Sequence, residues 1–171
     1  MRTRQSVRRW LLAGALAVGL ITTVVSIVPA QAAGGPNLAA GKAATASSTN
    51  SGFPASNVND GNQGSYWESA NNAFPQWVQV DLGSAQSASR VVLQLPAAWG
   101  ARVQRIEVVG STNNSTWTTL KAATDYTFAP GSNNTVTITF TASTQRYFRL
   151  NIQSNNAWPA GQISAFQVWN N

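Results

Sequence analysis

Short bursts of alternating apolar and polar residues follow one another along the chain from about residue 44 onward. Alternation with a period of two is typical of strands that are buried on one face only. Asn, Gly, Ser and Pro separate the bursts, and no stretch keeps the spacing of a helix. The clearest bursts are 77–82, 91–95, 106–109, 136–140, 148–152 and 166–168, with weaker ones at 44–48, 117–120 and 126–128. The pattern predicts an all-β protein with eight or nine strands, a jelly-roll β-sandwich.

Aromatic residues occur both within the predicted strands and between them. Those within strands are most simply core residues. This group comprises Trp77, Trp117, Phe140, Phe148 and Trp169. Three connections, 50–76, 96–102 and 154–161, are long for plain hairpins and hold aromatics of their own. These are Phe53, Tyr66, Trp67, Phe74, Trp99 and Trp158. Aromatic loops at the end of a sandwich indicate a working surface.

The N-terminus has the composition of an export signal. Four arginines precede an apolar run from Trp10 to Val28, and the small-residue tripeptide Ala30-Gln31-Ala32 follows it. Such a tripeptide suits a signal peptidase. We therefore predict that residues 1–32 are a cleaved signal peptide, and that residues 33–171 form one secreted domain. An uncleaved anchor is the alternative, because the apolar run is just long enough to span a bilayer.

Charge and composition narrow the range of functions. The net charge of +6 falls to +2 without the leader, with seven Lys or Arg against five Asp or Glu, so no nucleic-acid partner is predicted. The absence of His and Cys excludes imidazole bases, thiol nucleophiles, structural zinc and disulfides. Glycoside hydrolysis usually needs two paired carboxylates, and none of the five acids has an evident partner. We predict that the protein is not an enzyme.

Three motifs in this order resemble the discoidin domain, also called the coagulation factor V/VIII type C domain. They are Ala55-Ser56-Asn57-Val58-Asn59-Asp60-Gly61-Asn62-Gln63-Gly64-Ser65-Tyr66-Trp67, Pro75-Gln76-Trp77-Val78-Gln79-Val80-Asp81-Leu82-Gly83, and Tyr147-Phe148-Arg149-Leu150. This group includes the family 32 carbohydrate-binding modules, and segments 67–77 and 95–102 look most similar to modules attached to bacterial α-glucan hydrolases. The resemblance implies a galactose-binding-domain-like fold and a secreted, non-catalytic module. It also implies a polysaccharide or glycan ligand, α-glucan among them, and as partner a glycoside hydrolase acting on the same polymer.

The resemblance further implies a structural calcium under the first long loop. Carried over position by position, its ligands are the Asn57 carbonyl, the Asp60 carboxylate, the Asn62 carbonyl and the Ser65 hydroxyl. Calcium prefers six to eight oxygens, and the glutamate that closes the shell in the family falls on Ala165 here. With one carboxylate left, any site should be weak, at ~0.1–1 mM. The alternative is that Asp60 and Gly61 simply form a turn that needs no metal.

A pyranose presents an apolar C–H face and an edge of hydroxyls, so its binder needs an exposed aromatic plane and short polar groups. The resemblance puts Trp158 at the stacking position of the last loop, and Trp99 can form a second platform. The candidate hydroxyl partners are Glu68, Asn71, Asn72, Arg102 and Gln162. Many galactose-binding relatives carry histidine where Glu68 stands, which favours glucans over galactose. We expect Tyr66 and Trp67 to pack beneath the site.

Each candidate also has a purely structural interpretation. The loop indoles can fold back onto the edge of the sandwich, and the asparagines can satisfy turns. Arg102 can simply pair with Glu68 or Glu107. The rival function is adhesion to a cell surface or to phospholipid through Phe53, Phe74, Trp99 and Trp158. Anionic membranes reward clusters of four or more cations, which the loops lack, so we rank polysaccharide binding ahead of membrane binding.

Overall fold

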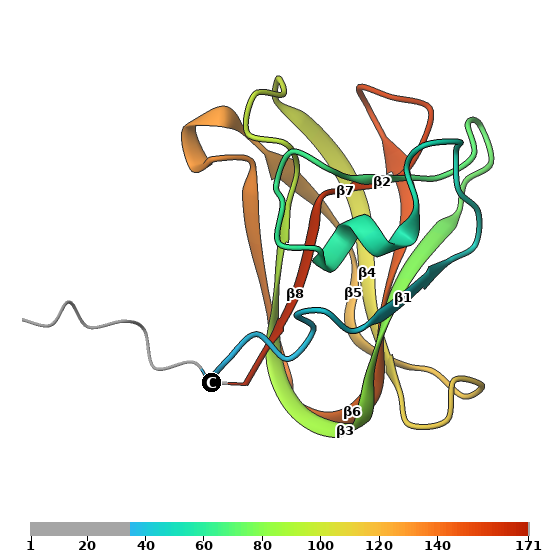
Figure 1. The fold of residues 1–171 in the computed structure, drawn as a ribbon, viewed down its shortest axis with the longest axis vertical. Helices are drawn as coiled ribbons and strands as arrows, with labels where there is room; N and C mark the ends of the chain where they lie inside the picture. Colours follow the sequence, from blue (N-terminus) through green and yellow to red (C-terminus); the bar gives the residue numbers. More distant parts are fainter. Residues whose placement is uncertain (1–34, 171) are drawn as a thin grey trace, which may run out of the picture. The chain divides into compact units, whose positions relative to one another are not determined.

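The computed structural model describes residues 35–170, and the predicted signal peptide at 1–32 lies outside this part. Within residues 35–170 the chain forms eight β-strands and two short 3₁₀ helices (Figure 1). In chain order these are β1 Ala43–Ala46, η1 Ala55–Asn59, β2 Trp67–Glu68, β3 Gln76–Gln94, β4 Arg102–Ser111, β5 Thr118–Phe128, η2 Pro130–Ser132, β6 Thr135–Asn155, β7 Gln162–Ile163 and β8 Ala165–Trp169. No helix among the described residues is long and apolar enough to cross a membrane. The predicted all-β fold is confirmed.

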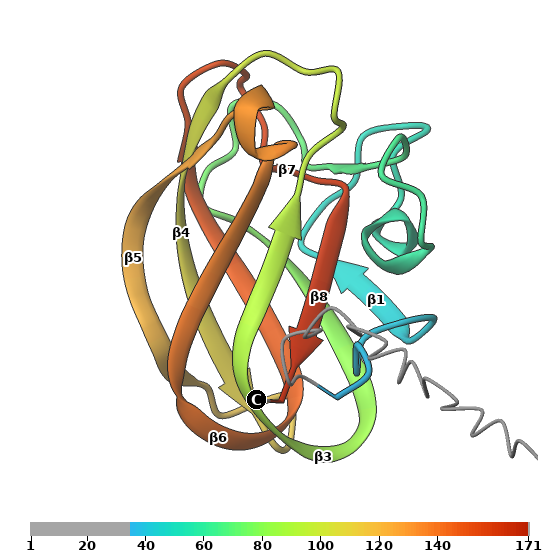
Figure 2. The same ribbon diagram turned by 90° about the vertical axis from the view of Figure 1, so that its left-hand side faces the viewer.

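Two long bent strands build both layers of the sandwich. The first half of β3 pairs with β1 and with the second half of β6, which also pairs with β4, and β5 extends this layer beyond β4. The second half of β3 pairs with β8 and with the first half of β6, and these three segments together form the opposite layer. The register shifts near residues 81–90, where both strands curve between the layers (Figure 2). All of these pairings are antiparallel.

The core lies between the two layers and follows the alternation of the sequence. Every second residue from Val78 to Leu82 and from Val91 to Leu95 is buried, all of them in β3 except Leu95, which directly follows it. β6 contributes Phe148, Leu150 and Ile152. The indole of Trp67 is also fully buried, and its Nε1 donates a hydrogen bond to the Ser48 carbonyl at 3.0 Å. Because a buried indole N–H needs an acceptor, this bond fixes the loop after β1 to the buried Trp67 ring.

The assignment of every strand aromatic to the core is wrong for three tryptophans. Phe148 is fully buried and Phe140 packs against the core, but Trp77, Trp117 and Trp169 are half-buried and lie outside the core cluster. An arginine covers each of these three rings, at 5.4 Å or less from the ring centroid. A stacked guanidinium shields an aromatic ring on the outer face of a sheet, so these indoles need no place in the core.

Loops gather at one end of the sandwich, away from the described C-terminus (Figure 1). The short β2–β7 ladder lies at this end, with Trp67 opposite Ile163 and Glu68 opposite Gln162. The loop 95–101 and the loop 156–161 lie at the same end. The strands thus carry three segments that are distant in sequence to one surface.

Candidate functional site

The loops at this end enclose a shallow pocket of about 200 Å³. β2 and β7 each contribute a polar side chain, β4 begins beside it, and the loop 156–161 supplies an indole. The pocket is lined by Tyr66, Glu68, Trp99, Arg102, Ala157, Trp158 and Gln162. Five of the seven residues that the sequence suggested for a sugar site therefore share one cavity.

A continuous row of hydrogen bonds forms the polar side of the pocket. The two oxygens of Glu68 accept hydrogen bonds from Asn50 Nδ2 at 2.8 Å and from Gln162 Nε2 at 2.7 Å. Gln162 Oε1 accepts one from Arg102 Nη1 at 2.6 Å. Arg102 thus bonds an amide and forms an ion pair with neither Glu68 nor Glu107. Each carboxylate oxygen keeps a second lone pair, so the row is fixed and can still accept from a ligand.

The backbone behind this row is held by a fully buried amide. Gln104 Nε2 donates to the Gln162 carbonyl at 2.8 Å, and Gln104 Oε1 accepts from the Gln162 N–H at 3.1 Å. Next to it, Ser69 and Gly161 exchange two further hydrogen bonds of 2.9 Å. Such fully satisfied buried networks define one arrangement of the chain. The side chains of Glu68 and Gln162 therefore stand on a rigid base.

Trp99 is wedged in place on the apolar side. Its ring meets Tyr66 edge-on at 4.5 Å between centroids, and the Arg102 guanidinium lies 4.3 Å from its ring centroid. The buried Asn134 side chain donates to the carbonyls of Pro96 and Trp99 at 2.9 Å each, which fixes the loop. Trp99 thus forms a half-buried wall of the pocket. It is neither the fully exposed platform nor the ring folded back onto the sandwich, the two alternatives that the sequence left open.

Trp158 is the one large hydrophobic residue among residues 35–170 that is exposed, with 46% of its surface accessible. Its loop is closed by Asn155, whose Nδ2 donates to the Ala160 carbonyl at 3.0 Å and whose Oδ1 accepts from the Ala157 N–H at 3.1 Å. The loop is ordered by these bonds, yet the indole at its tip remains open to solvent. An exposed aromatic plane beside a fixed polar row is the arrangement that a sugar ring requires.

Burial shifts the two titratable groups that flank the indoles. Desolvation lowers the pKa of Arg102 from its ordinary value, although an arginine stays charged at neutral pH. Desolvation, and after it the charge of Glu68, raises the pKa of Tyr66, so its hydroxyl keeps its proton. At neutral pH the pocket therefore presents a charged guanidinium from Arg102 and a neutral hydroxyl from Tyr66.

Asn71 and Asn72 do not line the pocket. Asn71 Oδ1 accepts from Asn50 Nδ2 at 3.1 Å, and the Asn72 N–H donates to the Pro159 carbonyl at 2.8 Å, so both tie neighbouring loops together. Tyr66, which we expected beneath the site, lines it, whereas Trp67 does lie beneath. Asn50 was missed, because nothing local in the sequence marks a loop amide that reaches β2.

The residues of the Asp60 loop form a tight turn. The Asp60 oxygens accept from the Asn62 N–H at 2.8 Å and from the Ser65 hydroxyl at 2.6 Å. Gly61 has φ +81°, a left-handed conformation that favours glycine. The Asn57 side-chain nitrogen donates to the Tyr66 carbonyl at 2.9 Å. This bond does not use the Asn57 carbonyl oxygen, which is the predicted calcium ligand.

The same loop also brings together oxygens of the kinds that calcium binds. The Ser65 Oγ lies 2.9 Å from the Asn62 carbonyl as well as near Asp60, so three of the predicted ligand oxygens cluster. No group of three His, Cys, Asp or Glu residues is placed to hold a metal within residues 35–170. Ala165 lines a neighbouring cavity of about 270 Å³ together with Asn62, and offers no side-chain oxygen. Three clustered oxygens, one of them from a carboxylate, could supply part of the shell of six to eight oxygens that calcium prefers.

A family model for the F5/8 type C domain matches residues 43–166, and the chain belongs to this family. Among solved structures, it is similar to chitosan-binding module 1 from a chitosanase/glucanase of Paenibacillus sp. IK-5. The identity is 35%, the match covers 78% of this chain and 98% of that one, and the TM-score is 0.62. Chitosan-binding module 2 of the same enzyme, solved with chitotriose, matches at 32% identity, with 77% and 98% covered and a TM-score of 0.61.

A more distant structure is the family 32 module of AlyQ in complex with 4,5-unsaturated mannuronic acid. It matches at 25% identity over 74% of this chain and 92% of that chain, with a TM-score of 0.62. A search among curated proteins found no match. These three neighbours are carbohydrate-binding modules with the same sandwich fold, and the two chitosan-binding modules are derived from a chitosanase/glucanase.

Proposed function

We propose that this protein is a secreted, non-catalytic module that binds polysaccharide through the pocket at the loop end of the sandwich. The observation that carries the proposal is the exposed Trp158 indole beside the fixed row of Glu68, Gln162 and Arg102. A sugar ring stacks its C–H face on the indole and directs its hydroxyls to the row. The signal peptide that the sequence predicts at residues 1–32 supports secretion.

The expected affinity is modest. Burying ~60–100 Å² of apolar surface on one indole contributes about 1.5–2.5 kcal/mol at roughly 25 cal/mol per Å². Two or three hydrogen bonds add ~1 kcal/mol each, and association costs reduce the sum. Before these costs the sum is about 3.5–5.5 kcal/mol, so the dissociation constant should be high-micromolar or weaker. The module therefore gains firm attachment only on a polymer that offers many sugars.

The acids of the chain support a role in binding rather than hydrolysis. Glu68 is the only Asp or Glu that lines the pocket, and both of its oxygens are already engaged by amides. Hydrolysis of a glycosidic bond usually needs a second carboxylate about 5–10 Å away. Because the solved neighbours include modules from a chitosanase/glucanase, we propose as partner a glycoside hydrolase that acts on the same polymer.

The ligand class follows from the pocket and the relatives together. The sequence favoured α-glucan, whereas the two relatives above 30% identity are named as chitosan-binding modules. Each glucosamine unit of chitosan can carry an ammonium group, which the Glu68 carboxylate attracts. We therefore put chitosan first and neutral α-glucan second.

The test is a binding screen on insoluble chitosan, α-glucan and β-glucan, with vesicles of phosphatidylserine as a further arm. Wild type is compared with Trp158→Ala and with Trp169→Ala, a matched indole that lies on β8 outside the pocket. We expect retention on a polysaccharide that Trp158→Ala reduces at least about tenfold, corresponding to ~1.4 kcal/mol, and that Trp169→Ala preserves.

Two outcomes would reject the proposal. Unchanged retention of Trp158→Ala would place the binding surface elsewhere. Binding to the vesicles with no retention on any polysaccharide would favour the adhesion alternative, whose weakness is that Trp158 alone among the described large hydrophobics is exposed.

We also propose that the Asp60 loop binds calcium weakly. Its support is the cluster of the Asp60 carboxylate, the Asn62 carbonyl and the Ser65 hydroxyl. Calcium there would stabilise the turn between η1 and β2, and with one carboxylate its affinity should be in the ~0.1–1 mM range.

A further inference from the structure

The outer face of the β1–β3–β6–β4–β5 layer carries a second pocket, of about 280 Å³, that is separate from the loop pocket. Its walls come from β3, β4 and β6 and from the residue before β3. It is lined by Pro75, Gln76, Trp77, Glu107, Asn151 and Gln153. The lining thus combines an indole with one carboxylate and three carboxamides, and it contains no cation.

Strand register places the three central groups in one row. Trp77 of β3 lies opposite Asn151 of β6, and Asn151 lies opposite Glu107 of β4. Neighbouring strands are about 4.8 Å apart, so the row extends for about 10 Å across three strands. An aromatic plane followed by polar acceptors over this length is complementary to a short oligosaccharide, which has apolar C–H faces and hydroxyl edges.

The polar groups of the row are held in place by the sheet. Asn151 Nδ2 donates to Glu107 Oε2 at 2.9 Å, and the Thr119 hydroxyl donates to Glu107 Oε1 at 3.0 Å. These bonds leave Asn151 Oδ1 and a second lone pair on each Glu107 oxygen as acceptors. Glu107 and Asn151 are both half-buried, so their positions are defined while their outer edges face solvent.

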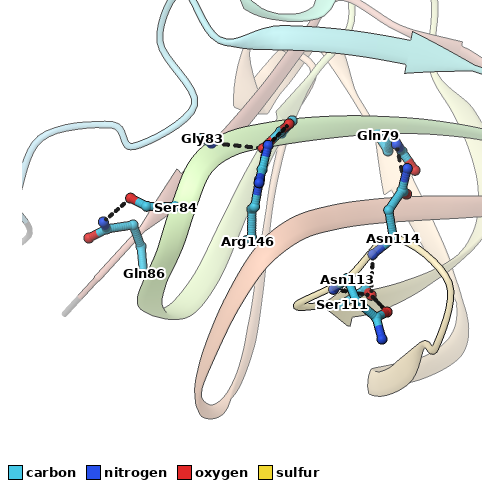
Figure 3. A network of polar contacts seen from close by, with 9 residues as sticks. Gln79, Gly83, Ser84, Gln86, Ser111, Asn113, Asn114 and Arg146 are labelled. Atoms are coloured by element: carbon cyan, nitrogen blue, oxygen red, sulfur yellow. Dashed lines mark hydrogen bonds and ion pairs between the residues drawn. The ribbon is translucent and has the colours of Figure 1, made fainter.

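Trp77 is held just as firmly. The Arg149 guanidinium lies between two indoles, 4.1 Å from the Trp77 centroid and 3.8 Å from the Trp117 centroid. Arg149 Nε and Nη2 donate to Gln79 Oε1 at 3.0 and 2.7 Å. Gln79 in turn donates to Asn114 at 3.2 Å, which continues the network along this side of β3 (Figure 3). The ring that lines the pocket is therefore preorganised.

We propose that this sheet-face pocket is a second carbohydrate subsite, for neutral or amino-sugar units of the polymer bound at the loop pocket. The proposal rests on the proposed function for its ligand class. Glu107 as the only charged lining group favours an ammonium-bearing unit such as glucosamine and disfavours polyuronates. Two subsites on different faces would let one module contact two chains, or two stretches of one chain, and so raise retention on a polymer.

The test is a titration of the isotopically labelled protein with chitotriose, followed by the backbone amide signals in NMR spectra. The variants are Trp158→Ala for the loop pocket and Gln153→Arg for the sheet-face pocket. Gln153 is exposed, so the arginine adds bulk and positive charge at the rim without entering the core. Thr139→Arg, at another exposed position of β6, is the matched control. Trp77 itself is left intact because it supports Arg149.

We expect two groups of signals to move in wild type, one near Trp158 and Gln162 and one near Trp77, Asn151 and Glu107. Trp158→Ala should abolish only the first group. Gln153→Arg should weaken the binding reported by the second group at least about fivefold and leave the first unchanged, and Thr139→Arg should change neither.

Signals that move at the loop pocket and stay still on the sheet face would overturn the second subsite and leave the proposed function intact. Movement on the sheet face alone would support the subsite and reject the loop pocket. If neither group moves, the amino-sugar ligand is wrong for both sites and this inference falls with it.

Discussion

The loop pocket and the sheet-face pocket both combine an indole with a carboxylate and at least one amide. They differ in which of these groups the protein itself covers. Trp158 stands at the tip of a loop with nearly half of its surface exposed, and its polar partners Glu68 and Gln162 are buried beside it. Trp77 is the reverse case, because Arg149 stacks on one face of its half-buried ring while the neighbouring amides remain partly open. The first indole is free to be covered by a ligand, and the second already contributes to the fold.

This difference separates binding from stability. An exposed indole that touches little of the protein costs little stability when it is removed, so its energy is available to a ligand. An indole locked by a stacked guanidinium stabilises the domain even without a ligand. Substitutions that change binding or stability alone test this separation.

Alanine at the two tryptophans should have opposite consequences. Trp77→Ala removes a half-buried ring and unstacks Arg149, and should lower the free energy of unfolding by about 2–3 kcal/mol. Trp158→Ala should change it by less than ~0.5 kcal/mol while sharply reducing polysaccharide binding. Urea denaturation of both variants measures the stability, and equal losses would contradict the separation of roles.

Gln104→Leu tests whether the buried amide positions the loop pocket. The change leaves the Gln162 N–H and carbonyl without their partners and should cost about 2 kcal/mol of stability. Polysaccharide binding should weaken as well, because Gln162 would lose its fixed place. Gln94→Leu, which removes a half-buried amide bonded to Thr135, is the matched control. Loss of stability with fully retained binding would show that Gln104 supports the fold only.

Glu68→Gln removes the negative charge of the loop pocket, and it also replaces one of the two oxygens that accept from Asn50 and Gln162. Retention on chitosan should fall by about fivefold to tenfold, since one attraction to an ammonium group is lost. Retention on neutral α-glucan should fall less. An equal loss on both polymers would mean that Glu68 acts only as a hydrogen-bond acceptor.

Ala165→Glu tests the proposed calcium site. The new carboxylate lies beside the cavity that Asn62 also lines, so it should strengthen calcium binding. Thermal unfolding with calcium or with a chelator is the measurement. We expect a small calcium-dependent rise in Tm for wild type, a larger rise for Ala165→Glu, and none for Asp60→Asn. Identical curves for all three proteins would rule out a metal at this loop.

The smallest effect concerns a site far from both pockets. The hydrogen bonds from Arg146 lower the pKa of Asp81 below its ordinary value of 3.8. The pair therefore stabilises the fold above this pH, and the contribution is lost as the pH falls through the lowered pKa. Asp81→Asn should be less stable than wild type at neutral pH, and the two should converge in strong acid. A stability gap that persists in acid would contradict this origin.

The sequence predicted the strand faces well because alternation reports burial directly. It did not predict that 77–82 and 91–95 form one strand, since a polar, bent stretch between two bursts resembles a turn. It also placed Trp77, Trp117 and Trp169 in the core, because the pattern of one strand does not reveal which arginine covers an outer face. The arginines that cover these rings lie on other strands, far away in the sequence. Arg149 of β6, for example, covers Trp117, which directly precedes β5.

The sequence predicted the residue types of the candidate site but not the strand pairing that brings them together. Trp158, Trp99, Arg102, Glu68 and Gln162 could be selected as loop or loop-edge residues with suitable chemistry, and the structure gathers them in one pocket. The polar row among them depends on the pairing of β2 with β7, two strands of two residues each, which no periodicity marks. Asn71 and Asn72 have the same chemistry, yet their bonds to Asn50 and Pro159 fix them in neighbouring loops.

The most direct measurement of the central claim is a set of intermolecular nuclear Overhauser effects between chitotriose or a malto-oligosaccharide and the protein. We predict strong effects between the C–H protons of one sugar face and the ring protons of Trp158, with weaker ones to Trp99. A bound sugar that shows effects to other residues and none to the Trp158 ring would contradict the account.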